Sequence, residues 1–192
     1  MNPIRLSDIH VDDFAERDIV PCLNYWYRSP PALMESMNID VEKLPSERRM
    51  QELLTILVLR GCSGMAPVPI LTIRHMDDAI GVHELTHLDA ECSAVMHAHI
   101  WYARYRGIGI GPVSYLAAMR IFFDRFDLQS IRFETPASNA SAQSVKRKLG
   151  IEPYGEGVID MPMLRHPVKT VSYRVLRHEL DSIERFVRST AG

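Results

Sequence analysis

The sequence predicts one α+β domain in which helices flank a mixed, mostly antiparallel sheet. Three observations lead there. Residues 1–65 follow helical periodicity, short β-branched and aromatic runs follow from residue 67, and a single strand–helix–strand unit interrupts those runs. A chain of 192 residues, 46% of them hydrophobic, can bury a core without disulfides. We therefore expect a single domain over 1–192, with a helical region at 1–65 and a sheet region at 66–178.

Three helices are predicted in the first region. The first opens at the acidic pair 12–13, keeps an apolar pattern to residue 26, and ends at the Ser-Pro-Pro sequence. A short second helix covers 32–37. The third begins at 45–47, where an acidic residue meets the positive end of the helix dipole, and runs to Leu59 before Gly61 stops it.

Strands dominate the second region, with two amphipathic helices between them. The predicted strands are 70–74, 79–88, 92–102, 131–135, 157–163 and 170–176, and the predicted helices are 112–126 and 140–149. Runs 79–88 and 92–102 form an antiparallel hairpin, because only a short polar turn separates them. The last two strands form a closing pair.

Charge and cysteine content exclude several classes of protein. The formal net charge of −2 argues against a general nucleic-acid coat or a polybasic membrane anchor. Three widely spaced cysteines without a C-x-x-C pair argue against a disulfide framework or a zinc ribbon. No targeting segment is visible, and the aliphatic run 53–59 is far shorter than the roughly 20 residues of a spanning helix. We expect a cytoplasmic protein without a nucleic-acid or membrane partner.

A glycine-rich segment links the strand 92–102 to the helix 112–126. It reads Arg106-Gly107-Ile108-Gly109-Ile110-Gly111-Pro112. The glycines permit a tight turn, and the proline presets the first turn of the helix. Such a loop points unpaired N–H groups and the positive end of a helix dipole at one place. That geometry suits a pyrophosphate.

Other interpretations of this segment fit less well. A P-loop needs Gly-Lys-Ser/Thr, which does not follow, and G-x-G-x-x-G needs a third glycine at an offset where none stands. Glu134 could still imitate the acidic ribose ligand of a dinucleotide fold. However, His97 and His99 alternate with apolar residues in the preceding strand, whereas a central parallel strand should be almost entirely apolar. A Rossmann half is the weaker alternative, and a flexible turn without a ligand is another.

A third pattern, R-x-x-G-x-G, is met by Arg106, Gly109 and Gly111. Twenty-eight residues after Gly111 stands Asn139, which opens the next helix and its closing Lys-Leu-Gly sequence. Together these motifs resemble the GNAT acyltransferase superfamily over about residues 80–155, closest to the branch of ribosomal-protein N-acetyltransferases of the RimJ/RimL type. The resemblance implies a GNAT-like sheet and an acyl-CoA-dependent N-acyltransferase.

The resemblance also implies a co-substrate and its ligands. Acetyl-CoA or another acyl-CoA would donate the acyl group, a primary amine of a small molecule or peptide would accept it, and no metal is expected. The region 1–65 would lie on the acceptor side, and 66–178 would bind CoA. The implied contacts are Arg106, Gly107, Ile108, Gly109, Ile110 and Gly111 for the pyrophosphate, Ile100, Trp101, Tyr102 and Asn139 for pantetheine, and Lys146 and Arg147 for the 3′-phosphate.

Two of these assignments have ordinary structural alternatives. Asn139 could be only the N-cap of the helix 140–149, because asparagine is among the preferred capping residues. Lys146 and Arg147 could form an ordinary solvated helix face. An edge strand near the C-terminus could support a homodimer.

The general acid is the point at which the sequence departs from the family. The resemblance implies a Tyr seven residues after Asn139, or a Ser three residues after it, but Lys146 and Ala142 stand there. Tyr154, just after the helix, is the remaining candidate acid. The alternative is a non-catalytic acyl-CoA-binding or regulatory module that kept the loop and lost the acid.

The general base is predicted on the hairpin. Side chains alternate along a strand, so His97 and His99 share one face, and on the partner strand Glu84 stands on the face opposite to His83. An imidazole titrates near pH 6.5 and could deprotonate an ammonium directly or through water. His99 lies closest to the predicted thioester, and Glu84 is the carboxylate alternative. Either could instead be an ordinary sheet residue.

Two further groups of residues are assigned to structure first. The histidines at 83, 87, 97 and 99 are spaced too widely along their strands for a zinc site without partners from across the hairpin. The aromatic run Tyr25-Trp26-Tyr27 is predicted to pack the N-terminal helices, with an aromatic lid over the acceptor as a second interpretation.

Overall fold

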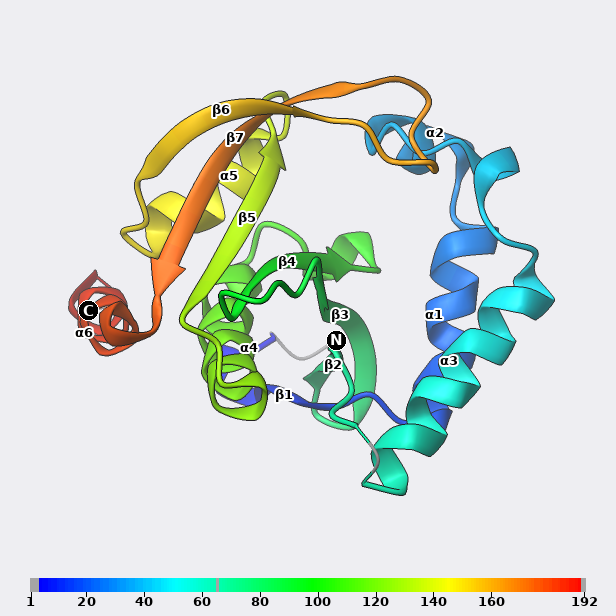
Figure 1. Cartoon of the computed structure of the whole chain (residues 1–192), viewed down its shortest axis with the longest axis horizontal. Coiled ribbons are helices and arrows are strands. Elements are labelled where there is room, and N and C mark those ends of the chain that lie inside the picture. Colours follow the sequence, from blue (N-terminus) through cyan, green and yellow to red (C-terminus); the bar gives the residue numbers. More distant parts are fainter. Residues whose placement is uncertain (1–3, 65, 191–192) are drawn as a thin grey trace.

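A computed structural model describes residues 4–64 and 66–190. Its centre is a seven-stranded sheet in the order β1-β2-β3-β4-β5-β7-β6 (Figure 1). All neighbouring strands are antiparallel except β4 and β5. The predicted class, a mixed and mostly antiparallel sheet flanked by helices in a single domain, is confirmed. The Rossmann alternative is excluded, because it requires a mostly parallel sheet.

The predicted elements occur in the predicted order with shifted ends, and strand β1 and helix α6 are present in addition to them. The strands are β1 (Ile9–Asp13), β2 (Ile70–His75), β3 (Asp78–Thr86), β4 (Ser93–Ile100), β5 (Ser130–Pro136), β6 (Pro153–Ile159) and β7 (Val168–Leu176). The helices are α1 (Glu16–Arg28), α2 (Pro31–Ser36), α3 (Glu47–Cys62), α4 (Ile110–Phe126), α5 (Ala140–Lys148) and α6 (Leu180–Thr190). No helix in the described ranges is long and apolar enough to cross a membrane.

The acidic pair predicted to open the first helix belongs instead to strand β1, which pairs with β2 along the sheet edge. The physical reason is the buried guanidinium of Arg74 in β2, which is 1% exposed. Its Nε donates to Asp12 at 2.8 Å, and its Nη2 donates to Asp18 of α1 at 2.8 Å. Asp12 is thus used to neutralise a cation in the sheet, and the region 1–65 is not purely helical.

The β6–β7 hairpin also differs from prediction, because its first strand ends at residue 159 rather than 163. The tip of the hairpin crosses to α2 and the turn after it (Figure 1). There Leu164 pairs with Ile39 in an isolated bridge, and Asp40 donates its backbone N–H to Met163 at 2.8 Å. Residues 160–164 are therefore held by the N-terminal region and do not extend the sheet.

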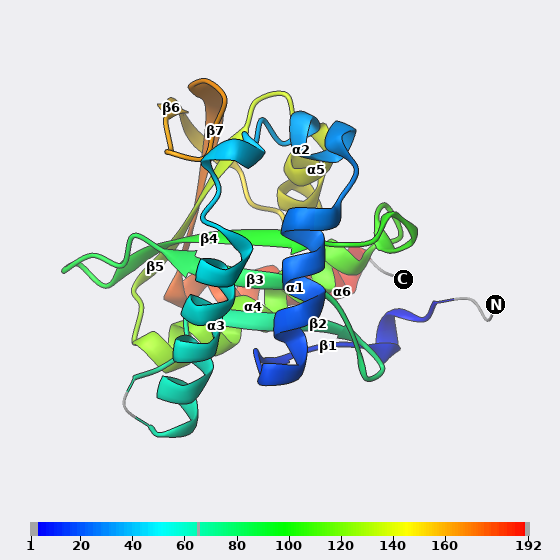
Figure 2. The same cartoon turned by 90° about the vertical axis from the view of Figure 1, so that its right-hand side faces the viewer.

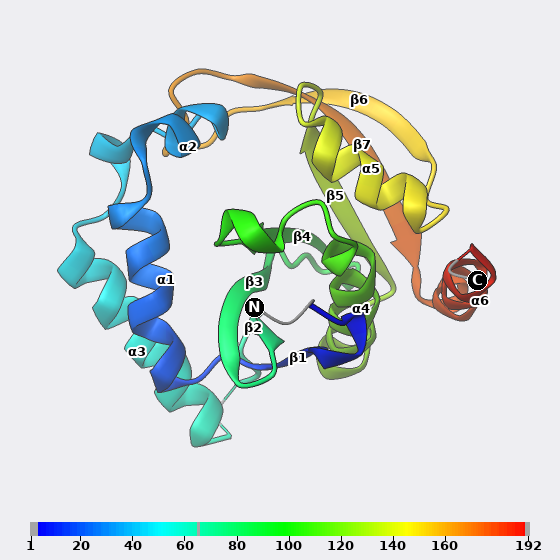
Figure 3. The same ribbon diagram turned by 180° about the vertical axis from the view of Figure 1, so that it is seen from behind.

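Helices cover both faces of the sheet. Helices α1 and α3 pack on the face that Figure 2 turns toward the viewer, around a core that includes Leu23, Val82 and Trp101. Helix α4 lies on the opposite face, as Figure 3 shows from behind, around a core that includes Phe122 and Phe133. Helices α5 and α6 contact α4.

The parallel pair β4–β5 is short. Its register runs only from Ser93↔Ser130 to Val95↔Arg132. Beyond that point β4 continues to Ile100 beside β3 alone, and β5 continues to Pro136 beside β7 alone. The two strands therefore separate and leave one edge of each unpaired in the middle of the sheet.

Candidate active site

The separated edge of β4 carries free backbone donors. Trp101 donates its N–H to Ile80 of β3 at 2.8 Å. Because alternate residues of an antiparallel strand bond to opposite sides, the N–H groups of Ala98 and Ile100 point away from β3, toward the opening. Within the predicted pantetheine segment 100–102, Trp101 is thus already paired. An extended ligand along this edge would bond to Ile100 and Ala98.

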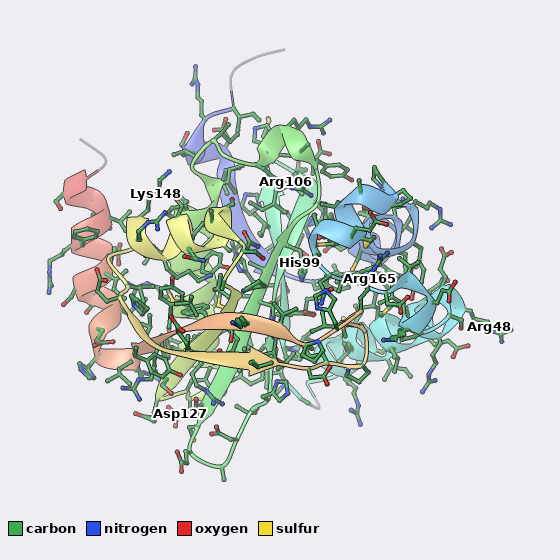
Figure 4. The ribbon with its side chains drawn as sticks, turned by 90° about the horizontal axis from the view of Figure 1, so that it is seen from above. Arg48, His99, Arg106, Asp127, Lys148 and Arg165 are labelled. Carbon is green, nitrogen blue, oxygen red and sulfur yellow. The ribbon has the colours of Figure 1, made fainter. Side chains whose placement is uncertain are left out.

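The side chain of Arg106 is committed to the backbone at the end of β4. Its Nε donates to the Ile100 carbonyl at 3.0 Å, and its Nη2 donates to the Trp101 carbonyl at 3.1 Å. Figure 4 labels Arg106 and His99, which in that view lie between α5 and the α1–α2 region. From the sequence, the Arg106 guanidinium was expected to bind the pyrophosphate. In the structure it instead holds the turn that precedes the glycines.

The glycine loop exposes several backbone donors at the start of α4. Gly107 and Gly109 adopt φ values of 77° and 94°, which side chains other than glycine rarely tolerate. The N–H groups of Gly107, Ile108 and Gly109 meet no acceptor in residues 4–64 and 66–190. Unpaired N–H groups at a helix N-terminus form an anion site. Helix α4 begins at Ile110, which is buried. The predicted start of this helix at residue 112 was therefore two residues too late.

The third glycine of the motif has a packing role. A Cβ built at Gly111 would lie 2.7 Å from Cγ2 of Val145 in α5. The missing side chain therefore lets α5 approach the first turn of α4. Helix α5 and the start of α4 therefore pack against each other.

Asn139 is the N-cap of α5, because its Oδ1 accepts the N–H of Ala142 at 3.0 Å. Its side-chain NH₂ has no hydrogen-bond partner in the described part of the chain and stays free to donate. Arg147 is exposed on the same helix and remains a prediction for the 3′-phosphate. The structure bears on both interpretations of Asn139: the cap is present, and a donor is left over.

Lys146 departs from its expected place. It is 2% exposed, and its Nζ donates to the hydroxyl of Tyr115 in α4 at 3.0 Å. A solvent-facing lysine that could reach a 3′-phosphate was expected, so this assignment is corrected. Residues 142, 145 and 149 form the apolar stripe of α5, and 146 lies within that stripe at the i, i+3, i+4, i+7 spacing. That spacing was the signal in the sequence for its burial.

His99 forms a hydrogen-bonded group with Tyr25 of α1. The Tyr25 hydroxyl lies 3.0 Å from His99 Nδ1 and donates to the Met37 sulfur at 3.1 Å. A thioether can only accept, so a hydroxyl proton that is directed to the sulfur leaves the Tyr25 oxygen to accept from Nδ1–H, whereas a proton directed to Nδ1 gives the other tautomer. In the first of these tautomers the lone pair of the ring is on Nε2.

Burial sets the ionisation of this group. It lowers the pKa of His99 to about 4, and the charges of His97 and Arg106 add to the effect. The imidazole is therefore neutral at physiological pH, and the expected titration near 6.5 is corrected downward. Glu84, which faces His97 across the β3–β4 register, has its pKa raised by burial. Both candidate bases lie on the α1 face of the sheet.

Tyr154 is separated from the opening. It lies on the edge strand β6, is 54% exposed, and stacks under the Arg174 guanidinium. Strand β7 stands between β6 and β5, so Tyr154 is about 10 Å from β5 at the strand spacing of about 4.8 Å. That distance removes it as the acid for a reaction at the β4 edge.

The remaining predicted residues divide between the two faces. His83 is buried toward α4, opposite to His97 and His99. Tyr102 is 41% exposed, and Arg104 lies over its ring. No cluster of three or more metal-ligating His, Cys, Asp or Glu side chains occurs in the ranges that the structure describes.

Comparison with known proteins gives no match at the level of sequence: neither a family model nor a curated protein matches. Solved structures do match. RimJ of Mycobacterium smegmatis in complex with CoA-disulfide is 14% identical, with 95% of this chain and 89% of that chain covered at a TM-score of 0.70. Spermidine N-acetyltransferase of Vibrio cholerae, in complex with CoA and spermine, is 16% identical over 91% and 98%, with a TM-score of 0.69. A GNAT-family acetyltransferase of Bacillus anthracis is 14% identical over 89% and 96%, with a TM-score of 0.66.

The chain has the GNAT fold. Its structural neighbours include RimL, a ribosomal L7/L12 N-acetyltransferase, as well as RimJ, which confirms the predicted resemblance to that branch at the level of fold. At such low identity, the roles of individual residues rest on this chain's own geometry.

Two residues of the site were not assigned from the sequence. Tyr25 was interpreted only as a packing residue or part of a lid. The signal in the sequence was its hydroxyl, because a buried tyrosine usually hydrogen-bonds through that group. Tyr115 stands in the second turn of α4 among apolar residues, where the same signal applies.

Proposed function

We propose that the protein transfers an acyl group, most simply acetyl, from acyl-CoA to a primary amine. One observation supports this above the others: the free N–H edge of β4 ends beside the free N–H groups of the glycine loop. A ligand with an extended amide arm and a pyrophosphate is complementary to both surfaces at once.

Each part of the reaction has a residue available. The loop from Gly107 to Gly109 would hold the pyrophosphate, and Asn139 would donate to a pantetheine amide. The N–H of Ile100 would polarise the thioester carbonyl and hold the oxyanion. Nε2 of His99 would accept a proton from the attacking amine, which approaches on the α1 face. Positioning of the two substrates supplies much of the remaining rate.

The acceptor is proposed as an amine without further identity. Names of structural neighbours refer to spermidine in one case and to a ribosomal protein in another. The same chemistry, attack by an unprotonated amine, applies to both. Glu84 on the acceptor side offers a carboxylate to a cationic substrate.

A non-catalytic acyl-CoA-binding module is the second candidate. The observation that favours it is the absence of the family's Tyr or Ser at positions 146 and 142. Such a module would bind CoA with the same loop and edge but would not turn over.

The test is CoA release from acetyl-CoA in the presence of spermidine, an aminoglycoside, an amino acid and a short peptide with a free N-terminus. We expect release with at least one amine, together with the mass of the acylated product, and a strong loss in His99→Ala. CoA should raise the melting temperature and NADH should not. Tight CoA binding without transfer to any amine would leave the binding module as the function.

A further inference from the structure

Lys146 is a buried cation without a carboxylate partner in residues 4–64 and 66–190. Its Nζ donates to the Tyr115 hydroxyl and lies 4.5 Å from the centre of that ring and 4.9 Å from the centre of the Phe133 ring. Burial of an ammonium without a counter-charge is costly. Stability alone therefore does not account for a lysine at this core position of α5.

The contacts of Lys146 place it where β4 and β5 separate. Phe133 is the first residue of β5 beyond the paired register. The Tyr115 ring lies edge-on to His83, with 5.0 Å between the ring centres, and His83 stands opposite Ala98 of β4. Lys146 is thus on the α4 face of the opening, whereas His99 is on the α1 face. The two groups flank the free edge of β4 from opposite sides.

His83 does not neutralise this charge. Burial, followed by the charge of Lys146, lowers its pKa to about 3, so the imidazole is neutral. Neither of its ring nitrogens has a hydrogen-bond partner in the described structure. The contacts of the Lys146 Nζ are the Tyr115 hydroxyl and the rings of Tyr115 and Phe133. Such a site favours an anion that forms there during a reaction, because a preorganised charge stabilises developing charge strongly when water is excluded.

On the basis of the acyl transfer proposed above, we propose that Lys146 is the acid that protonates the departing thiolate of CoA, and that Tyr115 positions it. This assigns a donor to a reaction for which neither the family's Tyr nor its Ser is present. The geometry also separates the two proton transfers, with removal from the amine on one face of β4 and delivery to sulfur on the other.

The proton balance of the step is closed. When the tetrahedral adduct collapses, the C–S bond breaks and its electron pair leaves on sulfur. Lys146 gives one N–H proton to that sulfur, so CoA departs as the thiol and Lys146 becomes a neutral amine. The acceptor ammonium loses two protons as the amide forms. Both leave through His99 to solvent, and one proton from solvent restores Lys146 after CoA departs, so that one proton is released in the net reaction.

The experiment follows the ionisation of the CoA thiol in the binary complex, through the ultraviolet absorbance of its thiolate, so that no acceptor is needed. We compare the wild type, Lys146→Met, Lys146→Gln and Tyr115→Phe. The matched control is Lys148→Met, which removes an exposed charge from the same helix (Figure 4). An ammonium in contact with the thiolate lowers the ionisation midpoint by about one pH unit or more relative to free CoA.

We expect the lowered midpoint in the wild type and in Lys148→Met, and its return to the value of free CoA or above in both Lys146 variants. With an accepted amine, kcat should fall by about 10²–10⁴-fold in Lys146→Met, with little change in Lys148→Met. A smaller loss is expected in Tyr115→Phe, which keeps the charge.

An unchanged midpoint in a folded, CoA-bound Lys146→Met or Lys146→Gln protein would overturn the assignment. If the wild type lowers the midpoint but transfers to no amine, acyl transfer fails as the function and the pairing of Lys146 with the thiolate stands. If the wild type transfers to an amine but leaves the midpoint unshifted, acyl transfer stands and the role of Lys146 fails.

Discussion

The hydroxyl of Tyr25 lies 3.0 Å from Nδ1 of His99, and the direction of this hydrogen bond between α1 and β4 decides which nitrogen of the imidazole can act as a base. With the hydroxyl proton directed to the Met37 sulfur, which lies 3.1 Å away, the lone pair of the ring is on Nε2. A residue of helix α1 thus contacts the imidazole that we propose as the base.

The first prediction concerns this pair. His99→Ala should lower kcat/KM by about 10²–10⁴-fold without weakening CoA binding, because the cofactor contacts are mainly backbone groups. Tyr25→Phe should lower kcat/KM by up to about tenfold, the worth of one hydrogen bond. Tyr27→Phe is the control, since it loses a hydrogen bond to Pro45 outside the site. Equal kinetics in the two Phe variants would reduce Tyr25 to packing.

The second prediction concerns pH. The base form of His99 is neutral, and its pKa is lowered to about 4, so activity should be kept as the pH falls through 6.5. After correction for the unprotonated fraction of the acceptor, kcat/KM should show no inflection between about pH 5.5 and 7.5. A Glu84 base predicts a different pH profile. Burial raises the pKa of its carboxyl, so protonation removes this base at a higher pH than for an ordinary glutamate. A loss of activity toward acid pH that vanishes in Glu84→Gln would make Glu84 the base.

The third prediction concerns the glycine loop. Gly109→Val places a β-branched residue at a φ of 94° and should weaken CoA binding by more than tenfold. Gly64→Val is the matched control, because Gly64 also has a positive φ of 67° but lies at the end of α3. Both variants should lose a similar stability, about 1–2 kcal/mol, in urea denaturation. Isothermal titration with CoA should separate them, and equal affinities would remove the loop from the cofactor site.

The fourth prediction separates the two roles of Asn139. Asn139→Asp and Asn139→Ser both keep a capping oxygen, so α5 and the melting temperature should be unaffected. Both lack the NH₂ donor, so CoA affinity should fall by about 1–2 kcal/mol if that group binds a pantetheine amide. Full affinity in both proteins would leave Asn139 with the cap alone.

The sequence allowed the sheet, the glycine loop and α5 to be predicted because their signals are local. Glycines at 107 and 109 do adopt positive φ, and Asn139 does cap its helix. Strand β1 was not predicted, because its acidic residues resemble a helix start and their true partner, Arg74, is about sixty residues away. Such pairing depends on tertiary contacts that periodicity does not contain.

The same limit applies to the groups that we propose as catalytic. The contact between Tyr25 and His99 spans 74 residues, and the contact between Lys146 and Tyr115 spans 31. The family pattern indicated a Tyr at the position of Lys146, and the contact of this lysine with Tyr115 is known only from the structure. The commitment of Arg106 to its own backbone was equally invisible, because an arginine before a glycine loop is typical of a phosphate ligand.

Hydrogen–deuterium exchange with and without CoA tests most directly whether the opening between β4 and β5 is the acyl-CoA site. We predict slower exchange at the amides of Ala98 and Ile100 and across 107–109, since these N–H groups have no acceptor in the described residues of the free protein. Protection should be lost in Gly109→Val and kept in Gly64→Val. Protection by CoA confined to another surface, such as the groove between α4 and α6, would contradict this assignment.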